Sequence, residues 1–554
     1  MGETKKWDTR RTEYLGRMNQ AAPFIKKDKV VDAKDVIKLL EAVIKPGDKV
    51  NLEGNNQKQA DFLAECLSKV DKTKVHDLHM VQSALSLPIF LEIFEKGIAK
   101  KLDFAYSGPL GGPIAEFINK GKLQLGAIHT YLELFARYFV DLIPQVTLVC
   151  AYEGDSSGNL YTGFNTEDTP IQIEATKFSQ GIVIAQVNKL VDKVKRVDIP
   201  GDWVDIVIES PRPFYLEPLF TRDPALITDQ QVLMAMIALK GIYAKYGVQT
   251  INHGIGFYTS AIELLLPTYG EELGLKGKCC SHFALNPHPT LIPAIESGWV
   301  KTIHSFGGEL GMEQYCNARP DVYFVGPDGT MRSNRAYCQT AGHYALDMFI
   351  GGTLQIDKYG NSSTATAKRV AGFGGAPNMG CDAKGRRHPT DAWLKCGEEF
   401  VSQADYIGPM KRGKRLVVQM AETFLEKMAP AYVDQLDAYK LAENANLDLP
   451  PVMAYGDDIT HIISEEGIAN LHMCRSLDER MRAIEGIAGY TEVGLRADPK
   501  VTKQLREKGI LQTPEDLGID RSKATRSLLA AKNIREIVDW SGGLYQPPKR
   551  YHNW

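Results

Sequence analysis

Two stretches, VTLVCAYEGDSSGNLY (residues 146–161) and MFIGGTLQIDKYGNSS (residues 348–363), decide the fold because the second repeats the pattern of the first. Each begins as an apolar run typical of a buried strand and leads into an Asp-x-x-Gly-Asn turn. In such a turn Asp supplies local hydrogen bonds and Gly accepts a positive φ. The second turn begins 202 residues after the first. This spacing predicts two copies of one structural unit.

Two more landmarks keep nearly the same spacing. The run LPIFLEIFEKG, which ends at Gly97, is matched by HPTLIPAIESG, which ends 201 residues later at Gly298. The glycine turn at Gly54 is matched 200 residues later by Gly254. In each half this turn lies between an apolar run and a helical pattern, in KVNLEGNNQKQADFLAECL and VQTINHGIGFYTSAIELLL. The succession of strand, turn and helix predicts an α/β fold with two tandem domains and mostly parallel sheets.

The length of 554 residues is too great for one hydrophobic core. A proline-rich stretch, SPRPFYLEPLFTRDP, is the expected boundary between the halves. We expect an N-terminal extension (1–30), a first domain (31–224), a second domain (225–490) and a C-terminal helical tail (491–554). Beyond about residue 400 the pattern reads as more helical, including MAETFLEKMAPAYVDQLDAY, residues 420–439.

Composition excludes several classes of protein. Hydrophobic residues make up 44% of the chain and charged residues 24%, with a net charge of −3, so no global field attracts nucleic acid or a membrane surface. No apolar run is long enough for a membrane helix, and the charged N-terminus does not resemble a signal peptide. The nine scattered cysteines contain no CxxC pair, which is typical of reduced thiols. These features predict a cytoplasmic protein.

Several motifs resemble the coenzyme A transferase family, whose members carry two tandem α/β domains with the active site between them. They are GIVIAQV (181–187), DIPGDWVD (198–205), GIGF (254–257), GGTLQIDKYGN (351–361), GFGGAPN (372–378) and IISEEGIANLHMCRSLDERMRAI (462–484). Within that family, VAGFGGAPNMGCDAKGRRHPTDAW (370–393), NPHPTLIPAIESG and the Trp7-containing N-terminus are similar to malonate decarboxylase alpha subunits. The motifs cover most of residues 45–490.

The resemblance implies an acyl-carrier-protein transferase that exchanges acetate for malonate on a carrier-protein thiol. That thiol ends a phosphopantetheine arm in a dephospho-coenzyme A prosthetic group, and coenzyme A itself is a further expected ligand, without a metal. The implied partners are the carrier protein and the decarboxylase subunits. The chemistry is consistent with an activation step, because a thioester can hold the electrons released by decarboxylation as an enolate. Two alternatives are a coenzyme A transferase or citrate-lyase-type subunit for another carboxylic acid, and a scaffold that only holds the carrier.

Many coenzyme A transferases use a nucleophilic Glu about 25 residues after the GIG turn. The corresponding window here, CCSHFALNPHPTL (279–291), contains neither Asp nor Glu. Glu296 is one alternative nucleophile, but it lies 201 residues after Glu95, so the repeat favours a helix end at both positions. The working hypothesis is therefore direct transfer, in which a malonate carboxylate attacks the acetyl thioester. Such chemistry depends on oxyanion donors and cationic groups.

The candidate residues fall into three groups. Catalytic candidates are the oxyanion-donor side chains and strand-end turns His282, Asn286, Gly254, Gly256 and Asn55. Cofactor-binding candidates are Gly54, Gly372, Gly374, Gly375, Ala376 and Asn378, where glycine lets the backbone approach a ligand. Arg369 and Arg387 suit the second carboxylate of malonate, and with Arg386 and His388 they could also receive an acidic carrier protein.

Each candidate also has a purely structural alternative. The glycine turns can be simple tight connections, the arginines a solvated basic face, and His282 or His288 a satisfied core histidine. The stretch SGPLGGP (107–113) either lines the cleft or forms a structural turn. Cys279, Cys280, His282 and His288 fit no standard zinc spacing, and adjacent cysteines on a strand point away from each other.

Overall fold

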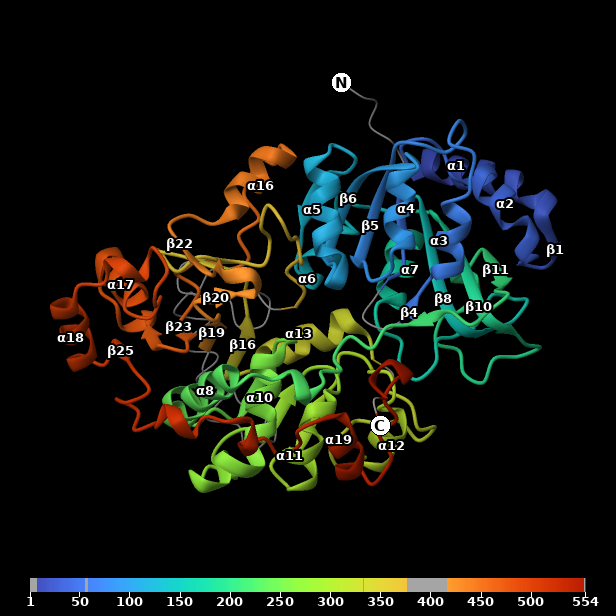
Figure 1. Cartoon of the computed structure of the whole chain (residues 1–554). Helices are drawn as coiled ribbons and strands as arrows, with labels where there is room; N and C mark the ends of the chain where they lie inside the picture. Colours follow the sequence, from blue (N-terminus) through green and yellow to red (C-terminus); the bar gives the residue numbers. More distant parts are fainter. Residues whose placement is uncertain (1–6, 55–57, 332, 376–415, 553) are drawn as a thin grey trace, which may run out of the picture.

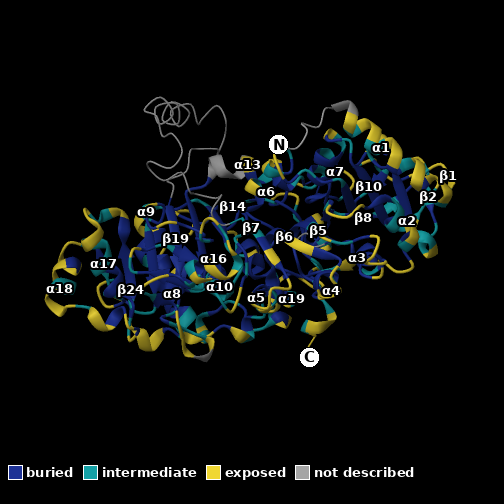
Figure 2. Ribbon diagram, turned by 90° about the horizontal axis from the view of Figure 1, so that it is seen from above, coloured by how far each residue is buried: buried dark blue, intermediate teal, exposed yellow. Residues whose placement is uncertain are grey.

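The structure, a computed structural model, describes residues 7–54, 58–331, 333–375, 416–552 and 554. Its two halves lie side by side, and each is built on a large sheet (Figure 1). Buried residues follow the strands of both sheets, and the exposed residues lie mainly on the outer helices (Figure 2).

The first sheet has the strand order β1-β2-β11-β10-β8-β3-β5-β6-β7. Its strands are β1 (Ile25–Lys27), β2 (Val30–Val31), β3 (Lys49–Leu52), β5 (Leu78–Ala84), β6 (Ala99–Tyr106), β7 (Gln124–Ile128), β8 (Val146–Gly154), β10 (Ile182–Leu190) and β11 (Ile206–Glu209). All neighbours from β2 to β7 are parallel, whereas β1 pairs with β2, and the short β9 (Leu160–Tyr161) with β8, in antiparallel fashion.

Helices cover both faces of the first sheet. They are α1 (Trp7–Ala21), α2 (Val36–Val43), α3 (Asp61–Leu67), α4 (Ile89–Glu95), α5 (Gly111–Asn119), α6 (Tyr131–Arg137) and α7 (Thr169–Phe178). Side chains alternate along β8, so Leu148 and Cys150 share a core with α2–α5, while Val149 and Ala151 belong to a core on the other face. Because both faces are covered, the central strands are apolar throughout.

The second sheet has the order β15-β14-β13-β16-β19-β23-β24-β25. Its strands are β13 (Thr250–His253), β14 (His282–Ala284), β15 (Thr302–His304), β16 (Met348–Gly352), β19 (Leu416–Met420), β23 (His461–Ser464), β24 (Gly467–Asn470) and β25 (Leu511–Gln512). Strands β15 to β23 are parallel, and β24 and β25 add antiparallel strands. The succession β15-β14-β13-β16-β19-β23 has the same connectivity as β6-β5-β3-β8-β10-β11 in the first half.

The second half also carries helices and small strand pairs. The helices are α8 (Asp229–Ala238), α9 (Ala244–Tyr246), α10 (Phe257–Leu265), α11 (Ile292–Glu296), α12 (Glu313–Ala318), α13 (Arg335–Ala345), α16 (Asp437–Ala445), α17 (Leu477–Glu485), α18 (Pro499–Glu507) and α19 (Ile534–Trp540). The short strands are β17 (Gln355–Asp357), β18 (Ser362–Ser363), β20 (Phe424–Leu425), β21 (Ala429–Pro430) and β22 (Tyr432–Val433). One further pair, β4 (Lys58–Gln59) with β12 (Tyr215–Leu216), ties the segment between the halves to the first half.

The repeated turns have the same internal hydrogen bonds. Asp155 Oδ1 accepts from the backbone N–H of Asn159 at 3.0 Å, and Asp155 Oδ2 accepts from Asn159 Nδ2 at 2.9 Å. Asp357 and Asn361 make the same two contacts at 3.0 and 2.9 Å. The glycine in each turn has a positive φ, 92° and 84°. The turns therefore form because Asp and Asn satisfy the backbone locally while Gly supplies the left-handed residue.

The expected helix over residues 420–439 was wrong for its first part. Residues 416–433 instead form β19, β20, β21 and β22 with one turn of 3-10 helix at Glu426–Met428, and α-helix begins only at Asp437. All five residues of β19 are buried between β16 and β23, so tertiary pairing overrides a helical pattern that Pro430 already interrupts. The C-terminal tail contributes α18 and α19, as the helical expectation implied, but it also adds β25 to the sheet.

The helices and the cysteines can be compared with what composition predicted. In the part of the chain that the structure describes, no helix is long and apolar enough to cross a membrane. The seven cysteines in this part, of which five are buried, are all free thiols.

Candidate active site

The carboxyl ends of the parallel strands carry the glycine turns of both halves. Gly54 follows β3, and a Cβ atom at this position would lie 2.4 Å from the carbonyl oxygen of Ala84. Gly254 follows β13, and a Cβ atom there would lie 3.0 Å from Gly351 Cα. A side chain is therefore excluded at Gly54 and tightly confined at Gly254, because a neighbouring strand approaches each backbone. In the second half the turn leads into the nine-residue helix α10, whose first N–H groups lie at this edge.

Asn286 lies at the same edge of the second sheet, just after β14. Its side chain is 2% exposed, and its Nδ2 donates to the carbonyl oxygen of Gly308 at 2.9 Å. The neighbouring Gly307 has room only for hydrogen, because a Cβ atom there would lie 3.0 Å from Asn286 Nδ2 and 2.3 Å from Glu167 Oε1. Thus an amide side chain of the second half and a carboxylate of the first half meet beside one turn.

His282 does not join this group. It begins β14 and pairs in register with Thr250 and Thr302, so it lies at the amino end of the strand. Asn286 lies four positions further along the chain, an extended span of about 13 Å. Its Nδ1 is 2.7 Å from the Thr302 hydroxyl, and burial lowers its pKa. The two candidates are close in sequence, but β14 places them at opposite edges of the sheet.

His288 is a core histidine. Its Nδ1 lies 2.9 Å from Glu263 Oε1, which is also 2.8 Å from His253 Nδ1, and its ring stacks on Phe220. Burial alone would raise the pKa of Glu263, but the two imidazoles outweigh burial and lower it to about 2. This buried network satisfies His288 inside the second half. Among the described residues, no group of three or more His, Cys, Asp or Glu side chains is arranged to hold a metal ion.

Glu296, the alternative nucleophile, lies at the end of α11 as the repeat indicated. Its Oε1 accepts from the Tyr315 hydroxyl and from Arg319 Nη1, both at 2.6 Å. Its counterpart Glu95 ends α4 in the first half. Both contacts lie within the second half and agree with the role of a helix end.

The glycine-rich segment crosses from the second half onto the first half. The N–H groups of Phe373 and Gly374 donate to the carbonyl oxygen of Ala105 at 2.8 and 2.9 Å. Gly372 has φ +84°, and a Cβ atom there would lie 2.3 Å from that same oxygen. Glycine is therefore required at 372 for this contact with the end of β6. The crossing also reaches the 107–113 stretch, where the Ser107 N–H donates to the carbonyl of residue 371 at 3.0 Å.

Other candidates are placed only in part. Gly375 belongs to the same crossing segment, and Gly256 is the N-cap of α10 with open space around its Cβ position. Arg369 is exposed. Burial raises the pKa of Tyr106 at the end of β6, and the positive charges of Arg222 and Arg369 partly offset this rise. Asn55, Ala376, Asn378, Arg386, Arg387 and His388 lie outside the described residues.

Three charged residues at this edge were not singled out from the sequence. Glu167 and Asp168 directly precede α7 in the first half, and Arg335 begins α13 in the second half. Their exposed fractions are 0%, 0% and 1%. Arg335 Nη2 donates to Glu167 Oε2 at 2.7 Å, and its Nε lies 2.7 Å from Asp168 Oδ1. In the sequence these residues show only an acidic pair before a helical pattern, which is typical of an ordinary helix N-terminus.

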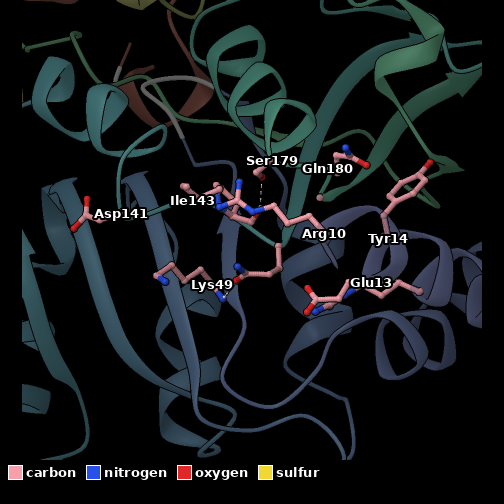
Figure 3. A pocket seen from close by; sticks show the side chains of 12 residues that line it. Arg10, Glu13, Tyr14, Lys49, Asp141, Ile143, Ser179 and Gln180 are labelled. Carbon is pink, nitrogen blue, oxygen red and sulfur yellow. Dashed lines mark hydrogen bonds between the residues drawn. The ribbon is translucent and has the colours of Figure 1, made fainter. Parts of the chain in front are cut away.

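A cavity of about 160 Å³ lies at the other edge of the first sheet (Figure 3). Lys49 at the start of β3, Gln145 before β8 and Gly181 before β10 line it, together with Arg10 and Tyr14 of α1. Because these are the amino ends of the strands, the cavity is separate from the glycine turns and from Asn286.

The repeated strand order, with the carboxyl-end turns of both halves meeting at Glu167 and Asn286, places the molecule in the class of coenzyme A transferase folds. An acyl-CoA transferase of Escherichia coli O157:H7 has this fold, with a TM-score of 0.51 and 14% identity over 80% of this chain and 87% of that chain. The fold predicted from the repeated turns is confirmed.

Sequence comparison then gives the family. Residues 6–554 match the family model "Malonate decarboxylase, alpha subunit, transporter", and the chain belongs to this family. A Malonomonas rubra protein named acetyl-S-ACP:malonate ACP transferase is 73% identical over all 554 residues and 100% of its own length. The solved structure of a Pseudomonas malonate decarboxylase hetero-tetramer in complex with malonate contains a chain with a TM-score of 0.91 and 55% identity, with full coverage of both chains. The family predicted from the motifs is confirmed.

Proposed function

We propose that this chain exchanges acetate for malonate on the thiol of an acyl carrier protein, as the activation step of malonate decarboxylation. The observation that carries the proposal is 73% sequence identity, over the full length, to a protein named for this reaction. The site agrees with acyl transfer, because buried amide and backbone donors gather at the carboxyl ends of two repeated sheets. None of the relatives described above is a citrate lyase subunit of comparable sequence identity, so the alternative of a citrate-lyase-type subunit has less support.

The reaction needs no oxidant and no external leaving group. An oxygen of one malonate carboxylate attacks the acetyl carbon, the C–S bond breaks, and the carrier thiolate leaves with the electron pair. The thiolate then attacks the malonyl carbon of the mixed anhydride, and the C–O bond breaks to release acetate. Both steps pass through a tetrahedral oxyanion, so donors that face this oxygen lower both barriers.

Asn286 lies in the window 279–291 in which the family's nucleophilic Glu is expected, and an amide cannot form the anhydride that a carboxylate would form. Asn286 with the Gly254–Gly256 turn therefore forms the proposed oxyanion-binding group of the second half. The crossing segment at Gly372–Gly375 lies against the end of β6 in the first half, and the nearby Arg369 is the proposed partner of the free malonate carboxylate. His282 is not part of this site because it lies at the opposite end of β14.

The proposed partners are the carrier protein with its phosphopantetheine arm in a dephospho-coenzyme A group, and the decarboxylase subunits of the same complex. Free coenzyme A is a further proposed ligand of this site. The Pseudomonas relative was solved in a hetero-tetramer, which supports an assembly of this kind. A cytoplasmic location follows from the sequence features and remains part of the proposal.

Intact-mass analysis of the carrier tests the activity. Acetylated carrier incubated with this subunit and malonate should acquire the malonyl mass, while citrate in place of malonate should leave the acetyl mass unchanged. An acetyl mass that persists with malonate at long times would favour the scaffold reading. Turnover of ¹⁸O-labelled malonate tests the direct mechanism, because label found on an enzyme Glu would contradict it.

A further inference from the structure

A line of buried polar groups joins the glycine turn of the first half to the Asn286 turn of the second half, and Arg335 lies at its centre. We propose that Arg335, acting through Glu167 and Asp168, is a positioning residue that fixes the two carboxyl-end turns relative to each other. This inference rests on the proposed function, and it adds how the two halves are held in register for the reaction. None of the three side chains is assigned contact with the substrate.

The centre of the line is a cation between two carboxylates. Arg335 comes from α13, which lies where the two halves meet (Figure 1) and packs against α6. Its guanidinium contacts Glu167 and Asp168 at 2.7 Å each and lies over the Tyr131 ring at 5.1 Å. A planar guanidinium suits two carboxylates at once, whereas a lysine ammonium is a single point charge. The residues that Arg335 joins are 168 and 167 positions away in the sequence, in the other half.

One arm of the line leads to the first turn. Asp168 Oδ2 is hydrogen bonded to the Ser83 hydroxyl, which also lies 3.1 Å from the carbonyl oxygen of Gly54. The next residue, Thr169, donates its hydroxyl to Glu53 Oε1. Residues 168 and 169 therefore hold Glu53 and Gly54, the residues directly after β3, by two routes.

The other arm leads to the second turn. Glu167 Oε1 accepts from the Gly308 N–H at 3.2 Å, and the carbonyl of Gly308 accepts from Asn286 Nδ2 at 2.9 Å. A glycine at 307 leaves space for the carboxylate, because a Cβ atom there would lie 2.3 Å from Glu167 Oε1. A shift of Glu167 would therefore move the backbone that orients Asn286.

The backbone of Glu167 supports a specific role. Its φ of +46° is in the left-handed region, which costs a residue with a side chain roughly 1–2 kcal/mol. Such a conformation persists only where the surroundings determine it, and here the hydrogen bond to Gly308 and the pair with Arg335 do so. Helix capping alone does not require it, since Asp168 is the N-cap of α7 and its side chain makes no capping hydrogen bond.

Two variants test the proposal with the full chain. Glu167→Gln leaves Arg335 paired with Asp168, so the protein should fold. The new side-chain NH2 group then faces either the guanidinium or the Gly308 N–H as donor to donor, and one of the two contacts of Glu167 is lost. Arg335→Lys keeps the positive charge but loses the planar guanidinium that contacts both carboxylates at once. Each should lower kcat for acetyl-to-malonyl exchange by about 10- to 100-fold with little change in KM for malonate, because displacement of the turns acts on the transition state. The double variant should be no slower than the slower single variant if the pair acts as one unit.

The matched control is a second ion pair between the halves. Arg196 of the first half pairs with Asp328 of the second half. Arg196 also contacts Gly163, Asp198 and Thr330, none of which belongs to the glycine turns or to the Asn286 turn. Asp328→Asn should therefore leave kcat unchanged. Unchanged kcat in Glu167→Gln and Arg335→Lys, a rise in KM alone, or an equal loss in Asp328→Asn would each overturn the proposal.

Hydrogen exchange gives a readout that does not depend on activity. In Glu167→Gln, amide exchange should accelerate in peptides that contain Glu53–Gly54 and in peptides that contain Gly307–Gly308, and Asp328→Asn should change neither. Unchanged amide hydrogen exchange at both turns would refute the positioning role, even if the enzyme showed no acetyl-to-malonyl transfer. Accelerated exchange together with an inactive wild-type enzyme would instead refute the proposed function and leave the positioning role standing.

Discussion

Replacing Glu309 with Gln should make the protein less sensitive to rising pH. Glu309 lies between β15 and α12 and has no exposed surface. Its Oε1 accepts from the Thr221 N–H at 2.9 Å and from the Thr221 hydroxyl at 2.7 Å. Burial raises its pKa to about 8, against an ordinary value of 4.5, despite these hydrogen bonds. In the folded protein this carboxyl is therefore protonated at neutral pH.

The sign and size of the effect follow from proton linkage. Between pH 5 and pH 8 the unfolded chain has released this proton while the folded chain still holds it, so the free energy of unfolding falls as pH rises. With pKa values of about 8 and 4.5, the fall amounts to about 3–4 kcal/mol over that interval. In Glu309→Gln the amide oxygen can keep both Thr221 contacts, and this component of the pH dependence is absent.

Urea unfolding at several pH values measures the difference between the two proteins, in which other titrating groups cancel. The stability of Glu309→Gln relative to the wild type should rise by about 3–4 kcal/mol from pH 5 to pH 8. Glu116→Gln is the control, because Glu116 is exposed on α5 and pairs with Lys120. Its free energy of unfolding relative to the wild type should stay nearly constant over the same pH interval. A flat difference for Glu309→Gln would refute the argument that the buried carboxyl is neutral, and a falling difference would mean that it is ionised and stabilised.

Three further predictions concern the site and the repeat. Asn286→Ala should lower kcat about 100-fold in the intact-mass exchange assay while circular dichroism stays unchanged, and full activity would exclude Asn286 as an oxyanion donor. Gly372→Ala should cost at least about 2 kcal/mol in urea unfolding because its φ is +84° and its Cβ would meet the Ala105 carbonyl, whereas Gly256→Ala, with open space, should cost about 0.5 kcal/mol or less. Asp155→Ala and Asp357→Ala should each lower the free energy of unfolding by about 2–3 kcal/mol, and clearly unequal losses would argue against equivalent turns.

The sequence by itself determined the repeat and its class. Asp155–Asn159 and Asp357–Asn361 fold through contacts within five residues, so their pattern can be read directly from the chain. The glycines at 54 and 254 could likewise be placed after strands, because a strand, a turn and a helix each have a local signature. The sequence also showed that the window 279–291 contains no acidic side chain, but it did not separate Asn286 from His282 and His288.

Only the tertiary structure decided which residues meet. His282 and Asn286 are four residues apart, yet a three-residue strand, β14, places them at opposite edges of the sheet. Arg335 and Glu167 are 168 residues apart, yet they share a buried ion pair. The physical reason is that strand pairing and burial act between segments with no fixed sequence spacing. A charged residue can therefore look like a helix cap in the chain and become the contact between two halves once they pack.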